Sequence, residues 1–82
     1  MEKLTFYTRL NCHLCEEAYR LLVMVALDIP LEIDVIDITH NHNEAIRAVY
    51  AHRIPVISKS GAGTELAWPF TADDLRAYLH HR

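Results

Sequence analysis

The chain has 82 residues, 51% of them apolar, which is enough for one small hydrophobic core, so we expect a single domain spanning residues 1–82. Eight Lys and Arg against eleven Asp and Glu give a net charge of −3, which argues against nucleic acid as the main partner. The most apolar run, Leu21 to Leu27, is far shorter than the roughly 20 residues that cross a bilayer. No signal peptide precedes the first strand-like pattern, which predicts a cytoplasmic protein.

The chain opens with the pattern of a strand followed by a helix. Residues 3–8 alternate in polarity and are rich in β-branched and aromatic side chains, which predicts a strand with Leu4 and Phe6 on one face. Residues 13–27 carry apolar side chains at helical spacing and polar ones between them. The positions of this helix expected to face inward are Leu14, Ala18, Leu21, Leu22 and Val25.

A second strand and a short helix are expected next. Leu31–Asp37 alternates again, and a strand, helix and strand of these lengths form a βαβ unit whose right-handed crossover makes the two strands parallel. The inward side chains of the second strand should be Leu31, Ile33 and Val35. Residues 45–50 read as a short helix on the opposite face, with Asn41 or Asn43 as its cap.

The last third of the chain predicts two strands and a helix. Arg53–Ser58 is expected to be a strand that has Pro55 near its start, since proline cannot pair in a central ladder. Gly61–Gly63 would form a tight connection to Thr64–Ala67, a short antiparallel partner. The final helix is expected to be capped by Thr71 and Asp74 and to turn Leu75, Tyr78 and Leu79 inward.

The chain's only cysteines, Cys12 and Cys15, stand between the first strand and the first helix. A Cys-x-x-Cys pair in this position is typical of a redox site, because the helix N-terminus stabilises the nucleophilic thiolate. Asn11 or Cys12 would be the helix cap, and Cys12 is expected to be the more exposed sulfur. In a reducing cytosol such a pair is catalytic or metal-binding more often than structural. The alternative is two buried cysteines that act as small hydrophobic residues.

The order strand, helix, strand, helix, two strands and helix, with Cys-x-x-Cys after the first strand and Ile54-Pro55 at the third, resembles the thioredoxin fold and, within it, the glutaredoxins. The chain is similar to small bacterial glutaredoxin-like proteins catalogued as a domain of unknown function, which share the Arg53–Val56 and Trp68–Phe70 motifs. The resemblance spans nearly the whole chain. It implies an α/β thioredoxin-like fold, βαβαββα, with a central four-stranded mixed sheet flanked by three helices.

The resemblance also implies roles for individual residues. Cys12 would be the nucleophile and Cys15 the resolving thiol of a thiol–disulfide oxidoreductase that reduces protein or glutathione mixed disulfides. Ile54-Pro55 would be a cis dipeptide that pairs with the backbone of a bound peptide or of glutathione. Arg9 would attract a glutathione carboxylate, and a cation there would favour the Cys12 thiolate. A monomer is expected, with no resident cofactor and with glutathione as a possible co-substrate.

The chain departs from the glutaredoxin pattern in two places. His13-Leu14 stands between the cysteines where glutaredoxins usually have Pro-Tyr, and Ala67–Phe70 replaces the Gly-Gly turn that holds the glutamyl end of glutathione. His13 could stabilise the thiolate when protonated, or point to water as an exposed first helical residue. Trp68 could form an apolar wall beside the site, or be a partly buried core aromatic.

Two other classes of function remain open on the sequence. The fold could serve as a binding module that holds a partner near Pro55 without turnover. The cysteines, with His13, could instead bind zinc or an iron–sulfur cluster, although a structural zinc site wants four ligands. Four further histidines do not complete such a set, since His40 and His42 are separated by one residue and His80 and His81 lie at the C-terminus. No metal is therefore expected.

Overall fold

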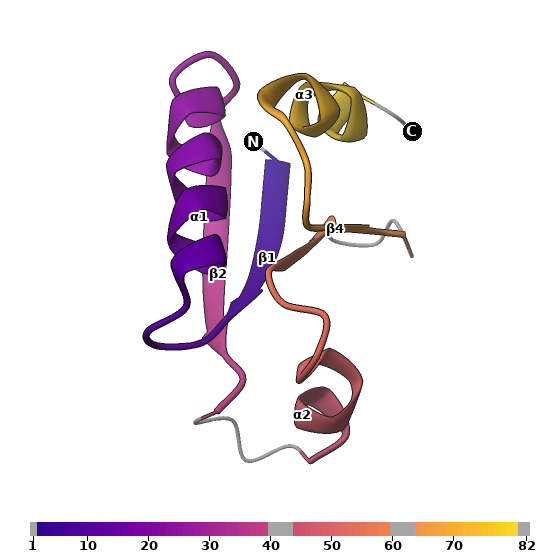
Figure 1. Cartoon of the computed structure of the whole chain (residues 1–82). Helices are drawn as coiled ribbons and strands as arrows, with labels where there is room; N and C mark the ends of the chain where they lie inside the picture. The colour runs from indigo at the N-terminus through magenta and orange to yellow at the C-terminus, as the bar shows by residue number, and fades with distance from the viewer. Residues whose placement is uncertain (1, 40–43, 60–63, 81–82) are drawn as a thin grey trace.

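The computed structural model describes residues 2–39, 44–59 and 64–80. These residues form one mixed sheet with strand order β2-β1-β3-β4, in which β1 and β2 are parallel and the other neighbours are antiparallel. The elements, in chain order, are β1 (Glu2–Thr8), α1 (His13–Ala26), β2 (Leu31–Asp37), α2 (Glu44–Tyr50), β3 (Val56–Lys59), β4 (Glu65–Ala67) and α3 (Ala72–His80) (Figure 1). The predicted βαβαββα order and the parallel first pair are confirmed. No helix among the described residues has the length and apolar character to cross a membrane.

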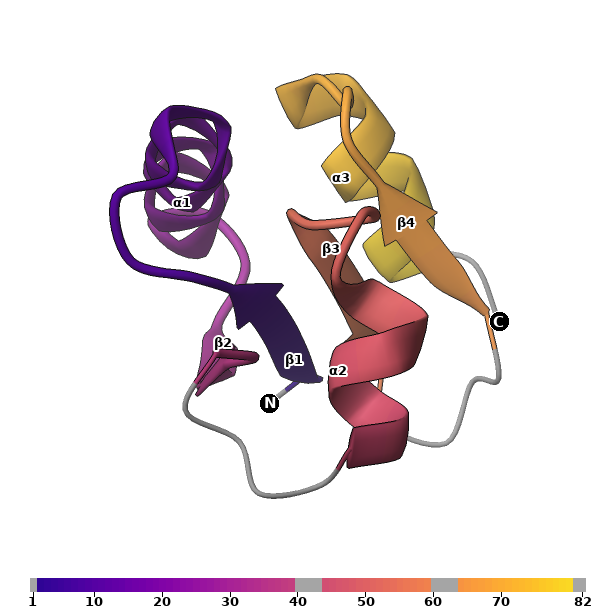
Figure 2. The ribbon, with the colours of Figure 1, turned by 60° about the horizontal axis from the view of Figure 1, so that its bottom comes forward.

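The core lies between the sheet and the two helices α1 and α3, which contact each other on the same face. Leu4 and Phe6 are 1% and 2% exposed and supply the sheet side of this core, as their alternation in β1 predicts. The helices contribute Ala18, Leu22, Val25, Leu75 and Leu79. Helix α2 lies on the other face of the sheet (Figure 2). There the Tyr50 ring stacks on the Tyr7 ring.

The inward face of α1 differs from the expected one at its first turn. Leu14 is 45% exposed, whereas Cys15 is 3% exposed and begins the buried stripe that continues through Ala18, Leu22 and Val25. Positions 15, 18, 22 and 25 follow the i, i+3, i+7 spacing of one helix face, and Leu14 lies at the edge of that face, about 100° around the helix from Cys15. The prediction that Leu14 packs inward is wrong because the cysteine takes that place.

Two strand predictions also need correction. β3 begins at Val56 and not at Arg53, because the Arg53 N–H donates to the Tyr50 carbonyl in the turn after α2, and Pro55 has no N–H to give to a ladder. Val35, expected to be buried, is 50% exposed. It lies on the edge strand β2, where a cavity separates it from α1.

Helix α3 is capped as predicted. The Thr71 N–H donates to the Asp74 carboxylate over 2.8 Å, and the Asp74 N–H donates to the Thr71 hydroxyl over 3.1 Å, which is a reciprocal capping box. Tyr78 is partly buried and its hydroxyl accepts from the Lys59 N–H and donates to the Thr64 carbonyl. The predicted caps Asn41 and Asn43, the Gly61–Gly63 connection, and His40, His42 and His81 lie outside the described residues.

A polar cluster joins α2 to β4. The Tyr50 hydroxyl donates to the Glu65 carboxylate, and the Arg53 guanidinium lies 2.7 Å from the same carboxylate and 5.4 Å from the centre of the Tyr50 ring. The hydrogen bond to Glu65, together with partial burial, raises the pKa of the Tyr50 phenol. The hydrogen bond from Tyr50, together with the Arg53 charge, lowers the pKa of the Glu65 carboxyl.

We expect this cluster to make stability depend on pH. Because the Glu65 pKa is lowered in the fold, its contribution is present above the ordinary carboxyl value of 4.5 and is lost as the pH falls through the folded pKa. Because the Tyr50 pKa is raised, its contribution is present below the ordinary phenol value of 10.0 and is lost as the pH rises above it. Tyr50→Phe should therefore lower the free energy of unfolding by about 1 kcal/mol between these values, and by less outside them.

Urea unfolding at a series of pH values measures this difference. Tyr19→Phe is the matched control, because Tyr19 is a half-exposed tyrosine on α1, distant in the fold from the cluster. It should change the free energy of unfolding by less than about 0.5 kcal/mol at every pH. A Tyr50→Phe effect that is independent of pH would contradict the assigned hydrogen bond.

Candidate redox site

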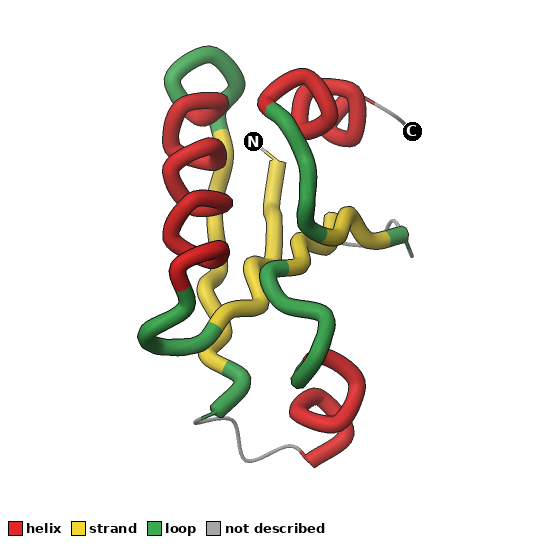
Figure 3. The backbone as a smooth tube through the Cα atoms, viewed as in Figure 1, coloured by secondary structure: helices red, strands yellow, loops and turns green. Residues whose placement is uncertain are grey.

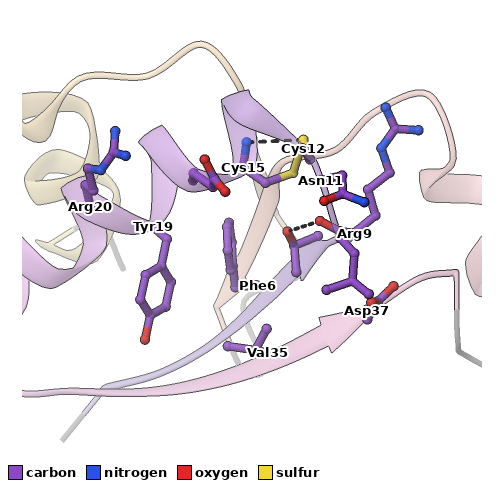
Figure 4. A pocket seen from close by; sticks show the side chains of 12 residues that line it. Phe6, Arg9, Asn11, Cys12, Cys15, Tyr19, Arg20, Val35 and Asp37 are labelled. Atoms are coloured by element: carbon purple, nitrogen blue, oxygen red, sulfur yellow. Dashed lines mark hydrogen bonds between the residues drawn. A yellow bond between two sulfur atoms is a disulfide. The ribbon is translucent and has the colours of Figure 1, made fainter.

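The two cysteines lie where β1 gives way to α1, at the end of the sheet where β1 finishes. Cys12 directly precedes α1, Cys15 is in its first turn, and the two form a disulfide with their Cα atoms 5.2 Å apart (Figure 4). The loop that contains Ile54 and Pro55 reaches the same end of the sheet, because β3 starts opposite the end of β1, with Val56 paired to Tyr7 (Figure 3). Two loops far apart in the sequence therefore meet beside the disulfide.

Local backbone geometry places the Cys12 sulfur at the N-terminus of α1. Asn11 adopts a left-handed conformation with φ 58°, which asparagine tolerates better than most residues, and so turns the chain into the helix. Cys12 is the N-cap, and its Sγ accepts a hydrogen bond from the Cys15 N–H over 3.2 Å. The sulfur thus occupies the position that a serine or aspartate oxygen takes in other helix caps. A helix N-terminus that donates to a sulfur stabilises its thiolate form.

Both sulfurs are largely covered by the fold. Cys12 is 9% exposed and Cys15 is 3% exposed, and both belong to the main hydrophobic cluster. Cys12 is more exposed than Cys15, as predicted, but the difference is small. Cys12 therefore offers a reaction partner slightly more surface than Cys15 does.

A cavity of about 620 Å³ opens beside the disulfide, between the start of α1 and the end of β2. Both cysteines line it, as does Arg9 from the loop before them. Its apolar lining includes Leu10 from the loop before the cysteines. It also includes Phe6, Tyr19 and Val35, which belong to three different elements and point toward the same space (Figure 4). Its volume lies within the range of about 300 to 1,000 Å³ that is usual for ligand pockets.

Of the residues predicted at the site, His13 and Leu14 lie outside this cavity. The His13 side chain is 77% exposed, and its Nε2 lies 3.5 Å from a Glu17 carboxylate oxygen one turn further along α1. Leu14 is 45% exposed. Both side chains therefore stand on the outer surface next to the cysteines, where a docking protein could touch them.

The other predicted site residues, Ile54, Pro55 and Trp68, lie close to one another. The Ile54-Pro55 bond is cis, as the resemblance implied, and Pro55 is buried. Ile54 and Trp68 are partly buried and pack against the hydrophobic cluster that contains both cysteines. The Trp68 ring meets the Phe70 ring edge-on, with the ring centres 5.1 Å apart, and the Trp68 backbone N–H donates to the Pro55 carbonyl. Trp68 is thus a partly buried core aromatic whose backbone is bonded to that of the cis-proline segment.

The sequence reasoning missed two features of this region. The Trp68-Pro69 bond is also cis, and no motif in the sequence pointed to it. The cavity was missed as well, because the patterns assigned Val35 to the core and Tyr19 to no role. The signal that could have found it is the parallel pairing of β1 and β2, which sets Val35 opposite Phe6 and so near the cysteines.

The described residues contain no group of three or more His, Cys, Asp or Glu side chains arranged to hold a metal ion. The cysteine pair, with His13 turned to Glu17, offers two sulfur ligands at most in this part of the chain. A structural zinc site wants four ligands. The chemistry that this donor set supports is exchange between thiols and disulfides.

Comparisons with known proteins agree with this architecture. The X-ray structure of target protein XcR50 from X. campestris has a TM-score of 0.78 and 36% sequence identity, over 93% of each chain. The solution NMR structure of protein Ne2328 from Nitrosomonas europaea has a TM-score of 0.77 and 33% identity, over 94% of this chain and 89% of that one. No curated protein matches the chain.

The family model of the glutaredoxin-like domain (DUF836) matches residues 3–80, which include the cysteine pair, the cis-proline segment and all three helices. With the two solved structures, this establishes the α/β, thioredoxin-like architecture that the sequence predicted. The chain belongs to the glutaredoxin-like domain (DUF836) family.

Proposed function

We propose that this protein is a thiol–disulfide oxidoreductase that reduces disulfide-containing proteins or glutathione mixed disulfides. The observation that carries the proposal is the hydrogen bond from the Cys15 N–H to the Cys12 sulfur at the start of α1, in a pair already joined as a disulfide. A sulfur held in this way is a good nucleophile when reduced and a good leaving group when oxidised.

The reaction begins with the reduced dithiol. The Cys12 thiolate attacks one sulfur of the substrate disulfide, a Cys12–substrate mixed disulfide forms, and the other substrate sulfur leaves as a thiolate. Cys15 then loses its proton and attacks the Cys12 sulfur, which releases the second substrate thiol and forms the Cys12–Cys15 disulfide. Two electrons pass from the dithiol to the substrate. An external thiol reductant returns the pair to the dithiol state.

The surroundings of the pair fit these two roles. Cys12, at the helix cap, is the sulfur with some access to solvent, and Cys15 is covered and close enough to attack Cys12 without a large movement. In this proposal the backbone beside Pro55 and the exposed Leu14 and His13 contact the substrate, and Trp68 stiffens the wall behind them. Arg9 would attract a carboxylate of glutathione or of a protein substrate.

The activity needs no resident cofactor, and we place it in the cytoplasm, in a monomer that acts on a protein or glutathione disulfide. Turnover with a mixed-disulfide substrate tests the proposal directly. A midpoint potential near that of the cytosolic glutathione couple, together with measurable turnover, is the expected result. A protein that binds such partners but never exchanges a disulfide would be a binding module instead.

Serine variants of the two cysteines should separate their roles. Cys12→Ser should abolish exchange, because a hydroxyl supplies no nucleophile at neutral pH. Cys15→Ser should still attack, but mixed disulfides should accumulate on Cys12, and mass spectrometry of the protein after reaction would detect them. With glutathione as reductant, turnover of Cys15→Ser should fall to background, because the turn that holds the glutamyl end in glutaredoxins is replaced by Ala67–Phe70.

Reduced wild-type protein is the reference for folding of these variants, since the small disulfide ring itself contributes about 2 kcal/mol in the chain-entropy model. The thermal unfolding midpoint of Cys12→Ser should lie close to that reference, and that of Cys15→Ser should be lower, because a serine hydroxyl replaces a thiol that is 3% exposed. Activity of Cys15→Ser that rises and saturates with glutathione would contradict the expected loss of the glutathione site. Activity of Cys12→Ser would overturn the choice of nucleophile.

Alkylation provides an independent check of the same assignment. In the reduced protein at neutral pH, a limiting amount of iodoacetamide should label Cys12 before Cys15, since Cys12 has the greater exposure and lies at the helix cap. Peptide mapping after short reaction times measures the two rates. Equal rates, or faster labelling of Cys15, would be inconsistent with the proposed order of attack.

A further inference from the structure

The cavity beside the disulfide has no role in the exchange step described above. It is lined by both cysteines but not by Ile54, Pro55 or Trp68, so it lies apart from the cis-proline segment. We propose that this cavity binds an apolar side chain that neighbours the target cysteine of a protein substrate. The inference rests on the proposed oxidoreductase function, and it assigns that function a preference among protein disulfides.

Two apolar side chains that line the cavity are well exposed, although they lie next to the hydrophobic core. Tyr19 and Val35 are 43% and 50% exposed, and the Tyr19 ring lies 5.9 Å from the Phe6 ring at a tilted angle of 35°. Val35 lies opposite Phe6 in the parallel pairing of β1 and β2. An apolar group that entered the cavity would cover these exposed faces, and removal of such surface from water is favourable.

The charges at the rim balance one another. Arg9 and Arg20 supply two positive groups, and Glu16 and Asp37 supply two negative ones. The Asp37 carboxylate already accepts hydrogen bonds from the backbone N–H and the hydroxyl of Thr39, over 2.9 and 2.6 Å. The rim as a whole has no net charge, and Arg9 is the residue to which the proposed function gives a carboxylate partner, so the apolar lining determines what the interior of the cavity holds.

The position of the cavity determines which apolar group can reach it. A substrate cysteine bound to Cys12 has its sulfur at the wall of the cavity, since Cys12 is itself a lining residue. The next residue of the substrate chain is about 3.8 Å away, measured between Cα atoms, and its side chain can therefore extend into the cavity. A volume of about 620 Å³ accommodates an aromatic side chain and adjoining backbone. A large apolar residue beside the substrate cysteine is the expected occupant.

A binding experiment tests this without any redox step. Short peptides with serine in place of the target cysteine, and with either Phe or Gly beside it, are titrated into the oxidised, ¹⁵N-labelled protein. The Phe peptide should shift the amide resonances of Tyr19, Val35 and their neighbours and should bind about tenfold more tightly than the Gly peptide. Equal affinities, or shifts confined to the Ile54 and Trp68 region, would overturn the proposal.

A pair of valine variants provides the matched comparison. Val35→Glu places a charge in the apolar lining, whereas Val49→Glu makes the same change at an equally exposed valine on α2, which does not line the cavity; both valines are 50% exposed. Val35→Glu should reduce the Phe preference from about tenfold to less than twofold, and Val49→Glu should leave it unchanged. Tyr19→Ser, from a different element, should also weaken the preference, which guards against local misfolding of Val35→Glu.

Exchange kinetics distinguish a failure of this inference from a failure of the proposed function. Mixed disulfides of the cysteine-containing Phe and Gly peptides are offered to the reduced protein, and the rate of release of the leaving thiol is measured. Exchange at equal rates for both peptides would support the proposed oxidoreductase function and overturn the proposal that the cavity binds an apolar side chain. If the protein binds the Phe peptide preferentially but exchanges a disulfide with neither peptide, the result would support the binding role of the cavity and overturn the oxidoreductase function.

Discussion

The whole site depends on the packing of one face of α1 against the sheet. That face consists of Cys15, Ala18, Leu22 and Val25, all of them 3% exposed or less, and it packs on the side where Leu4 and Phe6 lie. Because Cys15 belongs to this stripe, the rotation of the helix about its axis is fixed by a cysteine of the disulfide as well as by aliphatic residues. With the rotation fixed, Cys15 stays buried against the sheet, and Cys12, the N-cap of the same helix, remains at the rim of the protein. Stability and chemistry therefore share one contact surface.

The sequence predicted the elements of this fold well, for reasons that are local. Alternation identified β1 and β2, the connection between them required a parallel pair, and the spacing of Thr71 and Asp74 identified the cap of α3. The cysteine pair and its position at a helix start could also be identified from spacing alone, and the resemblance added the cis bond before Pro55. These features depend on a few neighbouring residues, so the chain itself contains the information.

The rest could not be predicted because it depends on what lies across from each residue. Leu14 and Cys15 both fit an apolar helix face, and only the packing of α1 on Leu4 and Phe6 decides that the cysteine faces inward. Val35 fits the buried face of β2, yet no side chain of α1 covers it at the edge of the sheet. The cavity lies where Val35 has the pattern of a buried residue but is half exposed. The periodicity of a single sequence shows how polarity alternates along one helix or strand. It contains no information on the distance from that element to the element packed against it.

The attachment of α2 has a consequence for how the molecule opens. None of its residues is buried, and it meets the sheet through the stacked Tyr7 and Tyr50 rings and the Tyr50–Glu65–Arg53 cluster. A segment with so little apolar burial separates from a domain at a lower free energy than the core, in a local opening that leaves α1 and α3 packed. Its amide hydrogens should accordingly exchange with solvent faster than those of α1. Since α2 leads directly into the turn before Ile54 and Pro55, each such opening would loosen the cis-proline segment, and under the proposed function this would help a product to leave.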